Sequence, residues 1–253
     1  MHLIDSHCHL DFEQFDSDRE QLLGRCQQLG ISKLIVPGVQ ASRWERLIHI
    51  CGQSALLFPA IGLHPLFMEQ HSNSDLLALT ELLKQYPIVA IGEIGLDFYL
   101  KDHDKQGQID LFCQQLELAQ QHNLPVLLHI RKAHDHALSI LKKYPVSGGI
   151  VHAFNGSLQQ AEQYQKLGFH FGIGGAITHP RATRLRALVS ALPLASLVLE
   201  TDSPDMPLYA VESDRNSPEN IPLILATLSE LRQESMEEIA RVTTHNCMEL
   251  MTL

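Results

Sequence analysis

The chain begins with Leu3-Ile4-Asp5-Ser6-His7-Cys8-His9, a short apolar run that leads into two histidines one residue apart. In an extended strand, residues two apart point to the same face, so His7 and His9 are predicted to reach into one space while Cys8 points away. Seven further short apolar runs follow without sustained alternation of apolar and polar residues, as expected for parallel strands covered on both faces. The eight runs span residues 3–6, 33–37, 57–62, 89–94, 125–130, 149–153, 169–174 and 197–201.

Stretches with apolar residues at helical spacing lie between these runs. They span residues 16–29, 42–51, 75–85, 107–122, 133–144, 158–167, 181–192 and 218–232, and a further helix is expected over 236–250. Eight strand-then-helix units in a chain of this length predict an α/β fold, the TIM (β/α)8 barrel. We expect one domain over residues 1–253 with an extra C-terminal helix. A doubly wound open sheet is the alternative.

The composition narrows the classes of protein. A net charge of −10 argues against a broad basic face for nucleic acid. It leaves a nuclease possible in principle, because bound cations can supply positive charge where a phosphate must sit. Five cysteines without a CxxC pair favour a reducing compartment. Neither a signal peptide nor a membrane-spanning run is visible, so a cytoplasmic protein is expected.

Ionisable side chains follow or end six of the eight runs. They are His7 and His9 at the first run, His64 after the third, Glu93 at the fourth, His129 at the fifth, His152 at the sixth and Asp202 at the eighth. In a barrel the carboxyl ends of all strands meet at one face, where active sites are built. Each residue alone has an ordinary explanation, such as a turn, a cap or a hydrogen-bonded core histidine. Together they favour a metal site, because buried polar groups without partners are costly.

Imidazole and carboxylate ligands suit divalent zinc, manganese or iron. We expect His7 and His9 to bind one ion and His129 and His152 to bind a second, with Glu93 as the bridge. Two such ions roughly 3.5–4 Å apart would activate a water and stabilise the attacking and leaving oxygens.

Asp202, Arg131, His64 and Glu200 are assigned further roles, two of them with an alternative explanation. Asp202 is expected to bind metal and to accept the proton of the attacking water. Arg131 could hold a phosphate, or pair with a carboxylate. His64 could contact substrate, or pack beside Pro65. Glu200 could support the ligands from behind.

Three stretches carry a resemblance to a known family: Leu3 to Asp11, Pro125-Val126-Leu127-Leu128-His129-Ile130-Arg131 with the four residues after it, and Leu197-Val198-Leu199-Glu200-Thr201-Asp202-Ser203-Pro204. Gly62-Leu63-His64-Pro65 and Gly92-Glu93-Ile94-Gly95-Leu96-Asp97 agree with it. The chain resembles the TatD family of metal-dependent hydrolases, and a bacterial branch of it in particular. The resemblance implies a TIM barrel with two divalent cations (zinc, manganese or magnesium) and the ligands His7, His9, Glu93, His129, His152 and Asp202.

Relatives in that family act as deoxyribonucleases, so the resemblance implies a divalent-metal-dependent hydrolase that cleaves phosphodiester bonds in DNA with a metal-activated water. Two stretches depart from the family pattern, the loop from Asp205 to Tyr209 and His245-Asn246-Cys247 in the last helix. They leave open a metal-dependent hydrolase of a small ester, amide or phosphoester, and a metal-holding barrel that binds a partner. A monomer is expected, with neither a membrane nor an obligate protein partner, and residues 203–217 are predicted to form a loop over the barrel mouth.

Overall fold

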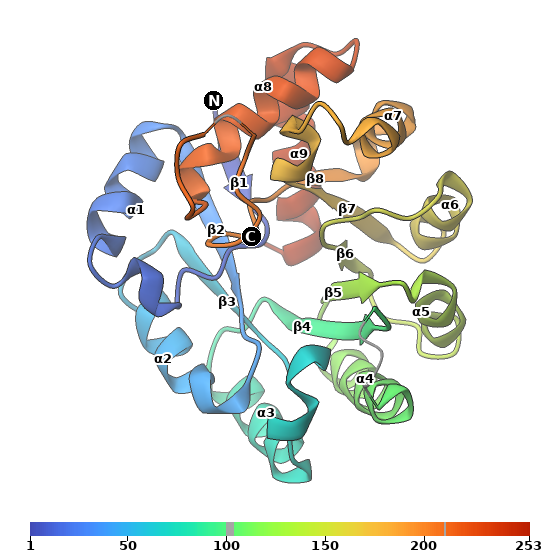
Figure 1. The fold of residues 1–253 in the computed structure, drawn as a ribbon. Coiled ribbons are helices and arrows are strands. Elements are labelled where there is room, and N and C mark those ends of the chain that lie inside the picture. The colour runs from blue at the N-terminus through green and yellow to red at the C-terminus, as the bar shows by residue number, and fades with distance from the viewer. Residues whose placement is uncertain (100–103, 210) are drawn as a thin grey trace.

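Eight parallel strands form one sheet in the order of the sequence, from β1 to β8. The computed structural model describes residues 1–99, 104–209 and 211–253 (Figure 1). The strands are β1 (Leu3–Asp5), β2 (Ile31–Pro37), β3 (Leu57–Ile61), β4 (Ala90–Asp97), β5 (Val126–Arg131), β6 (Gly149–Val151), β7 (Phe169–Ile173) and β8 (Leu197–Leu199). The predicted TIM barrel is confirmed, and the doubly wound sheet is wrong, because sequential strand order leaves no point at which the order reverses.

Backbone hydrogen bonds join the two edges of this sheet. The amide of Ser6 donates to the carbonyl of Leu199 at 2.9 Å, and the amide of Asp202 donates to the carbonyl of His7 at 2.8 Å. The segments that follow β1 and β8 therefore lie side by side. Two candidate ligands, His7 and Asp202, are brought together by the closure of the barrel itself.

Helices surround the strands on the outside and cover one end of the barrel (Figure 1). They are α1 (Arg19–Gln28), α2 (Ala41–Cys51), α3 (Asn73–Gln85), α4 (Lys105–His122), α5 (His134–Leu141), α6 (Leu158–Gln165), α7 (Thr183–Ala191), α8 (Ile221–Leu231) and α9 (Met236–Met251). Each predicted helix is present, with ends shifted by a few residues. The apolar stripes of α1 to α8 pack against the outer face of the barrel around large buried side chains such as Trp44, Phe112 and Tyr164.

The extra helix α9 covers the amino-terminal end of the strands. Its Thr244 hydroxyl donates to the carbonyl of His2, just before β1, and its Asn246 amide donates to the carbonyl of Leu194, just before β8. Cys247 and Met251 of α9 join a layer inside the barrel that is made of Ile4, Ile35, Ala60, Ala90, Leu127, Ile150 and Val198. The interior of the barrel is thus filled with apolar side chains at this end, and the predicted metal ligands lie at the opposite end.

Residues 203–217 were predicted to form a loop. Among the described residues of this segment, which exclude residue 210, the structure has no helix or strand apart from an isolated β-bridge at Ser203. The Asn216 amide fixes this segment by donating to the carbonyls of Thr201 at 2.8 Å and Met206 at 3.0 Å. No helix in the described ranges is long and apolar enough to cross a membrane.

Candidate metal centre

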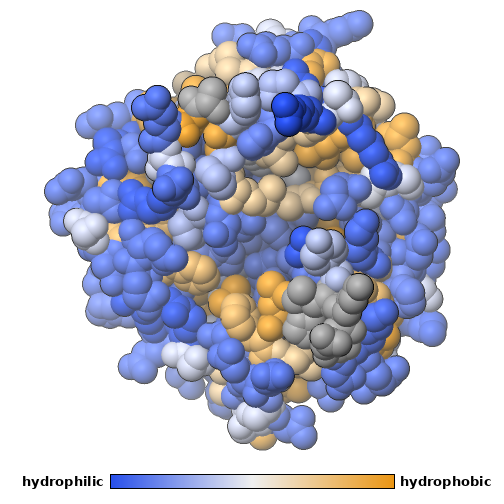
Figure 2. Space-filling view, in the orientation of Figure 1, coloured by the Kyte–Doolittle hydropathy of each residue, from blue (hydrophilic) through white to orange (hydrophobic). Residues whose placement is uncertain are grey.

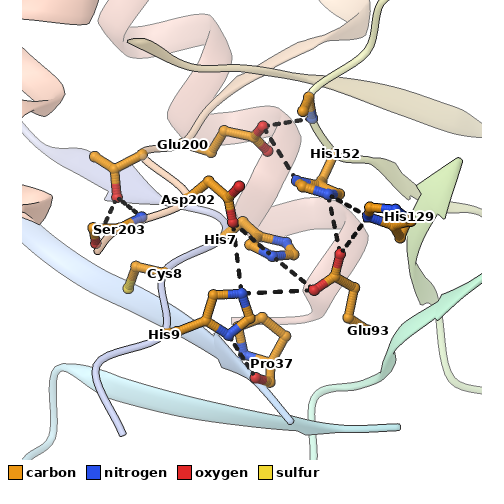
Figure 3. Close-up of polar contacts among 12 residues, drawn as sticks. His7, Cys8, His9, Pro37, Glu93, His129, His152, Glu200, Asp202 and Ser203 are labelled. Carbon is orange, nitrogen blue, oxygen red and sulfur yellow. Dashed lines mark hydrogen bonds and ion pairs between the residues drawn. The ribbon is translucent and has the colours of Figure 1, made fainter. Parts of the chain in front are cut away.

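Three histidines surround one oxygen of Glu93, and two of them, His129 and His152, are drawn in Figure 3. Oε1 of Glu93 lies 3.0 Å from Nε2 of His152, 3.1 Å from Nδ1 of His129 and 3.2 Å from Nε2 of His64. The rings come from the ends of β5 and β6 and from the segment after β3, so residues distant in sequence meet at the carboxyl ends of neighbouring strands.

The other oxygen of Glu93 faces the histidines that follow β1 (Figure 3). Oε2 lies 3.4 Å from Nε2 of His7 and 3.6 Å from Nε2 of His9. Oδ1 of Asp202 lies 3.5 Å from the same two nitrogens. One carboxylate therefore presents a different oxygen to each of two groups of side chains.

These separations fit divalent cations. Three sets of side-chain ligand atoms are close enough to surround a cation, because the atoms of each set lie within 4.8 Å of one another. They are His7–His9–Asp202, His7–Glu93–His152 and His64–Glu93–His129. Both ring nitrogens of His7 are buried without a hydrogen-bond partner among the described residues, and its Nε2 faces Glu93 and Asp202. A buried nitrogen of this kind normally has a partner, and a cation would supply one.

The placement of Glu93 differs from the prediction that it ends the fourth strand. β4 continues for four residues beyond it, to Asp97, and its register against β5 shifts between Ile91 and Ile94. The shift brings the backbone amide of Glu93 to the carbonyl of Gly38, at 2.9 Å. Glu93 reaches the centre of the mouth because of this irregularity, which no periodic pattern indicates.

Hydrogen bonds fix the orientation of two rings. Nδ1 of His9 donates to the carbonyl of Pro37 at 3.2 Å, and Nε2 of His129 donates to Oδ2 of Asp97 at 3.0 Å. When the ring is neutral, each bond leaves the other ring nitrogen with a lone pair that points into the cluster, which is the usual arrangement for a metal-binding histidine. This role of Asp97 was not predicted from the sequence, although the residue lies in the same motif as Glu93.

His64 has the opposite arrangement. Its Nδ1 accepts a hydrogen bond from the backbone amide of Leu66 at 3.1 Å, so the ring proton is on Nε2, which faces Glu93. Burial lowers the pKa of His64, which favours the neutral ring. His64 is therefore placed as a hydrogen-bond donor, although its distances alone would suit a ligand.

Burial lowers the pKa values of His7, His9 and His152, whereas the carboxylates of Glu93 and Asp202 raise them. Burial lowers the pKa of His7 to about 4, and the nearby charge of His152 adds to this effect. Burial also acts on His9 and His152, but hydrogen bonds and charges of Asp202 and Glu93 outweigh it and raise their pKa values to about 9 and about 10.

The two carboxylates are held in their ionised form. Burial would raise the pKa of Glu93 and of Asp202, but the surrounding histidines lower both below their usual values. Two ionised carboxylates and several imidazoles in one buried site favour the binding of cations.

Glu200 lies directly behind His152. Its Oε1 accepts from the backbone amide of Ala153 at 2.6 Å and lies 3.8 Å from Nδ1 of His152. Burial raises the pKa of Glu200 to about 8. Gly172 makes room for this side chain, because a Cβ there would overlap the Glu200 carboxylate.

A buried network ties β1 to the segment after β8. Oδ1 of Asp5 accepts from the amides of His7 at 3.1 Å and Thr201 at 3.0 Å, and its Oδ2 accepts from the Thr201 hydroxyl at 2.6 Å. These bonds position the backbone on either side of His7 and Asp202. Asp5 thus has a structural role that was not predicted from the sequence.

Arg131 lies outside the cluster, at its rim. Its guanidinium is 4.0 Å from Oδ2 of Asp97 and lies over the ring of Tyr99, 3.8 Å from the ring centroid. The side chain is 48% exposed, so it remains accessible to a ligand.

A TIM barrel whose strand ends carry a histidine and carboxylate cluster defines the class of metal-dependent barrel hydrolases. Comparison with known proteins then gives the family: the family model described as "TatD related DNase" matches residues 4–252, and the chain belongs to the TatD family of metal-dependent hydrolases.

Three comparisons support this assignment. The chain is 44% identical to the "Uncharacterized metal-dependent hydrolase YjjV" of Escherichia coli, over 96% of this chain and 95% of that protein. The crystal structure of Escherichia coli YjjV superposes with a TM-score of 0.95 at 43% identity, covering 99% of this chain and 98% of that one. The human protein named "Deoxyribonuclease TATDN3" is 30% identical over 98% of this chain and 94% of its own length. The expected family and its bacterial branch are confirmed.

Proposed function

We propose that this protein is a deoxyribonuclease that hydrolyses phosphodiester bonds with two divalent cations. The observation that carries the proposal is the position of Glu93, whose Oε2 faces His7 and His9 while its Oε1 faces His129 and His152. This arrangement supports one cation on each side of a bridging carboxylate. The four histidines suit zinc or manganese better than magnesium, which prefers oxygen ligands. When bound, such cations lower the pKa of water and withdraw charge from phosphoryl oxygens.

Asp202 is the proton acceptor in this proposal. The surrounding histidines keep its pKa low, so it is a carboxylate at neutral pH. Its side chain is 16% exposed, whereas Glu93 is 3% exposed, so Asp202 is the carboxylate that a water and a substrate can approach. A positioned carboxylate of this kind contributes by taking the proton of the attacking water.

His64 and Arg131 are the proposed substrate contacts. The proton on Nε2 of His64 points into the cluster, where it can donate to a non-bridging phosphate oxygen without changing the charge of the ring. Arg131 offers a charged fork at the rim, suited to the neighbouring part of the substrate.

DNA as the substrate is supported by the family description as a DNase and by the name of the human relative. A hydrolase of a small ester, amide or phosphoester is the second candidate, which the net charge of −10 favours because such a charge repels long polyanions. We further propose that the protein acts as a monomer, which its elution volume in gel filtration would test.

Parallel assays test the proposal. Protein loaded in turn with zinc, manganese or magnesium is incubated with a DNA oligonucleotide and with a panel of carboxyl esters, amides and phosphomonoesters. We expect cleavage of DNA, and a loss of about 10²- to 10⁴-fold for Asp202→Asn. The matched control is Asp214→Asn, an exposed carboxylate in the loop that follows Asp202, which should keep full activity. Uncleaved DNA beside a rapidly hydrolysed small substrate would favour the second candidate, and undiminished activity of Asp202→Asn would remove its role.

A further inference from the structure

A pocket of about 790 Å3 lies beside the metal centre, where α5 and α7 begin. It shares Arg131, Asn155 and Leu185 with a second pocket of about 380 Å3, whose walls include His152 and Asp202. A ligand at the metal centre can therefore extend into the larger pocket without leaving the protein surface. The face in Figure 2 carries hydrophilic residues at its centre, with apolar patches around them.

Four cationic side chains line the larger pocket, which we call the cationic pocket: Arg131, Lys132, Arg181 and Arg184. One carboxylate, Asp135, also lines it and accepts a hydrogen bond from the Gln160 amide at 2.8 Å. The excess of positive charge contrasts with the net charge of −10 of the whole chain.

Among the described residues, three of the four cations of this pocket lack the carboxylate partners that other arginines have, and the fourth, Arg131, lies 4.0 Å from Asp97. Arg25 forms an ion pair with Glu219 at 2.5 Å, and Arg215 forms one with Asp18 at 2.7 Å. Within residues 1–99, 104–209 and 211–253, Lys132, Arg181 and Arg184 have no carboxylate within 4.0 Å. Unpaired cations that line a concave surface raise the local concentration of anions.

The backbone around the cationic pocket also contributes positive electrostatic potential. Lys132 adopts a φ of 56° in the turn between β5 and α5, a conformation that is uncommon for a lysine and that is found mainly where a local structure imposes it. The N-cap positions of α5 and α7 are Ala133 and Ala182, neither of which makes a side-chain cap. The free first-turn amides add positive potential to the cationic side chains, although they would not make a site by themselves.

An exposed aromatic ring stands on the rim of the cationic pocket. Tyr99 is 54% exposed and lines the pocket, with the guanidinium of Arg131 over its ring at 3.8 Å. Leu185 provides an apolar surface on the side shared with the metal centre. Cations next to an aromatic ring and an apolar wall form a surface that suits a nucleotide, with its phosphate on the cations and its base on the ring.

We propose that the cationic pocket is a second phosphate subsite, which binds the phosphodiester next to the one positioned at the metal centre. The inference rests on the proposed function and adds that efficient substrates carry at least two phosphates. Arginine is suited to this task, because its planar fork binds two oxygens of one phosphate. The subsite selects oligonucleotides over small esters by binding, without taking part in bond cleavage.

The test uses Arg181→Gln/Arg184→Gln in the full chain loaded with metal. The matched control is Lys84→Gln/Arg241→Gln, which changes the net charge equally at residues outside the cationic pocket. The binding probe is an octathymidylate with phosphorothioate linkages, which resists hydrolysis, followed by fluorescence anisotropy at several salt concentrations. The activity probe is thymidine 5′-(p-nitrophenyl phosphate), which has a single phosphodiester. Inorganic phosphate is added as a competitor.

We expect the subsite variant to bind the oligonucleotide about tenfold more weakly than the control, with a slope of log affinity against log salt smaller by about 0.7 for each phosphate that the protein no longer neutralises. Hydrolysis of the single phosphodiester should be the same in both variants. Inorganic phosphate should compete weakly if the subsite binds a phosphate of a chain, and as strongly as the oligonucleotide if it binds a free phosphate group.

Equal affinity and equal salt slope in the subsite variant and the control would overturn the inference. The inference would also be overturned if the subsite variant lost as much activity on the single phosphodiester as it lost affinity for the oligonucleotide, because the arginines would then act at the metal centre. Failure of the proposed function gives a different result: the protein without substitutions would cleave neither thymidine 5′-(p-nitrophenyl phosphate) nor unmodified DNA, while the binding comparison would still report on the pocket.

Discussion

Replacing Asp97 with asparagine should weaken the half of the metal centre that contains His129. Asp97 is fully buried, and its two oxygens accept from two donors: Oδ2 from Nε2 of His129 at 3.0 Å and Oδ1 from the backbone amide of Tyr99 at 3.0 Å. An asparagine of the same shape has only one accepting oxygen, so its NH2 group must face one of these donors. If it faces His129, the ring adopts the tautomer with its proton on Nδ1, the atom that is needed for the cation.

Loss of a carboxylate that orients a metal-binding histidine typically costs 10- to 100-fold in metal affinity. This corresponds to about 1.4–2.8 kcal/mol, at 1.4 kcal/mol for each factor of ten. The backbone of Asp97 is held independently, because its amide donates to Oε1 of Gln108 at 2.9 Å and its carbonyl accepts from the Gln108 amide at 3.2 Å. We therefore expect the loss to fall on metal binding and the fold to be preserved.

Competition with a chelator of known affinity measures the two dissociation constants, and circular dichroism checks the fold. Asp97→Asn should weaken one of the two binding steps and leave the other close to its original value. Asp110→Asn is the matched control, an exposed carboxylate on α4 that accepts only from Gln106 among the described side chains. Unchanged affinity at both steps in a folded Asp97→Asn protein would refute the assignment of His129 as an oriented ligand.

The variant His64→Gln should keep its metal, because the His64 ring is a hydrogen-bond donor and not a ligand, but its KM for DNA should rise about tenfold. Metal analysis and steady-state kinetics measure the two effects, and loss of one metal ion would contradict this role. Gly172→Ala should lower the free energy of unfolding by roughly 1–3 kcal/mol, because the new methyl group overlaps the carboxylate of Glu200. Gly24→Ala, with nothing within 4 Å, is its control in urea denaturation, and equal effects would argue against that overlap. Metal affinity should rise from pH 6 to about pH 10 and then level off, because the pKa values of His9 and His152 are raised to about 9 and about 10 and both protons must leave before the cations can bind. Calorimetric titration in buffers of different ionisation enthalpy measures the protons released, and an affinity independent of pH would contradict the expected exchange.

The barrel could be predicted from the sequence because its strands are short apolar runs with a histidine or carboxylate at several carboxyl ends. Each of these ends is placed on one face by the topology alone, so Asp202 and His7 could be expected to meet although 195 positions separate them in the printed sequence, 202 − 7. The extra helix α9 was also predictable from its periodicity, but its place over the amino-terminal end of the strands was not, because nothing in a helical stripe indicates which surface it covers.

The groups that orient the site could not be predicted with the same means. Asp97 follows Glu93 within β4 and reaches His129 only because the register of β4 shifts before it. Asp5 has the appearance of an ordinary strand residue until its bonds to Thr201 are seen. The carbonyl of Pro37 has no side-chain signature at all. The proton position of His64 depends in the same way on a backbone amide two residues later.

Anomalous diffraction from crystals of the metal-loaded protein, recorded on both sides of the absorption edge of the metal, tests the central claim most directly. Two peaks roughly 3.5–4 Å apart, on opposite sides of the Glu93 carboxylate, are predicted, with His7 and His9 beside one and His129 and His152 beside the other. A fully loaded crystal with no peak within bonding distance of Glu93 would contradict the two-cation centre.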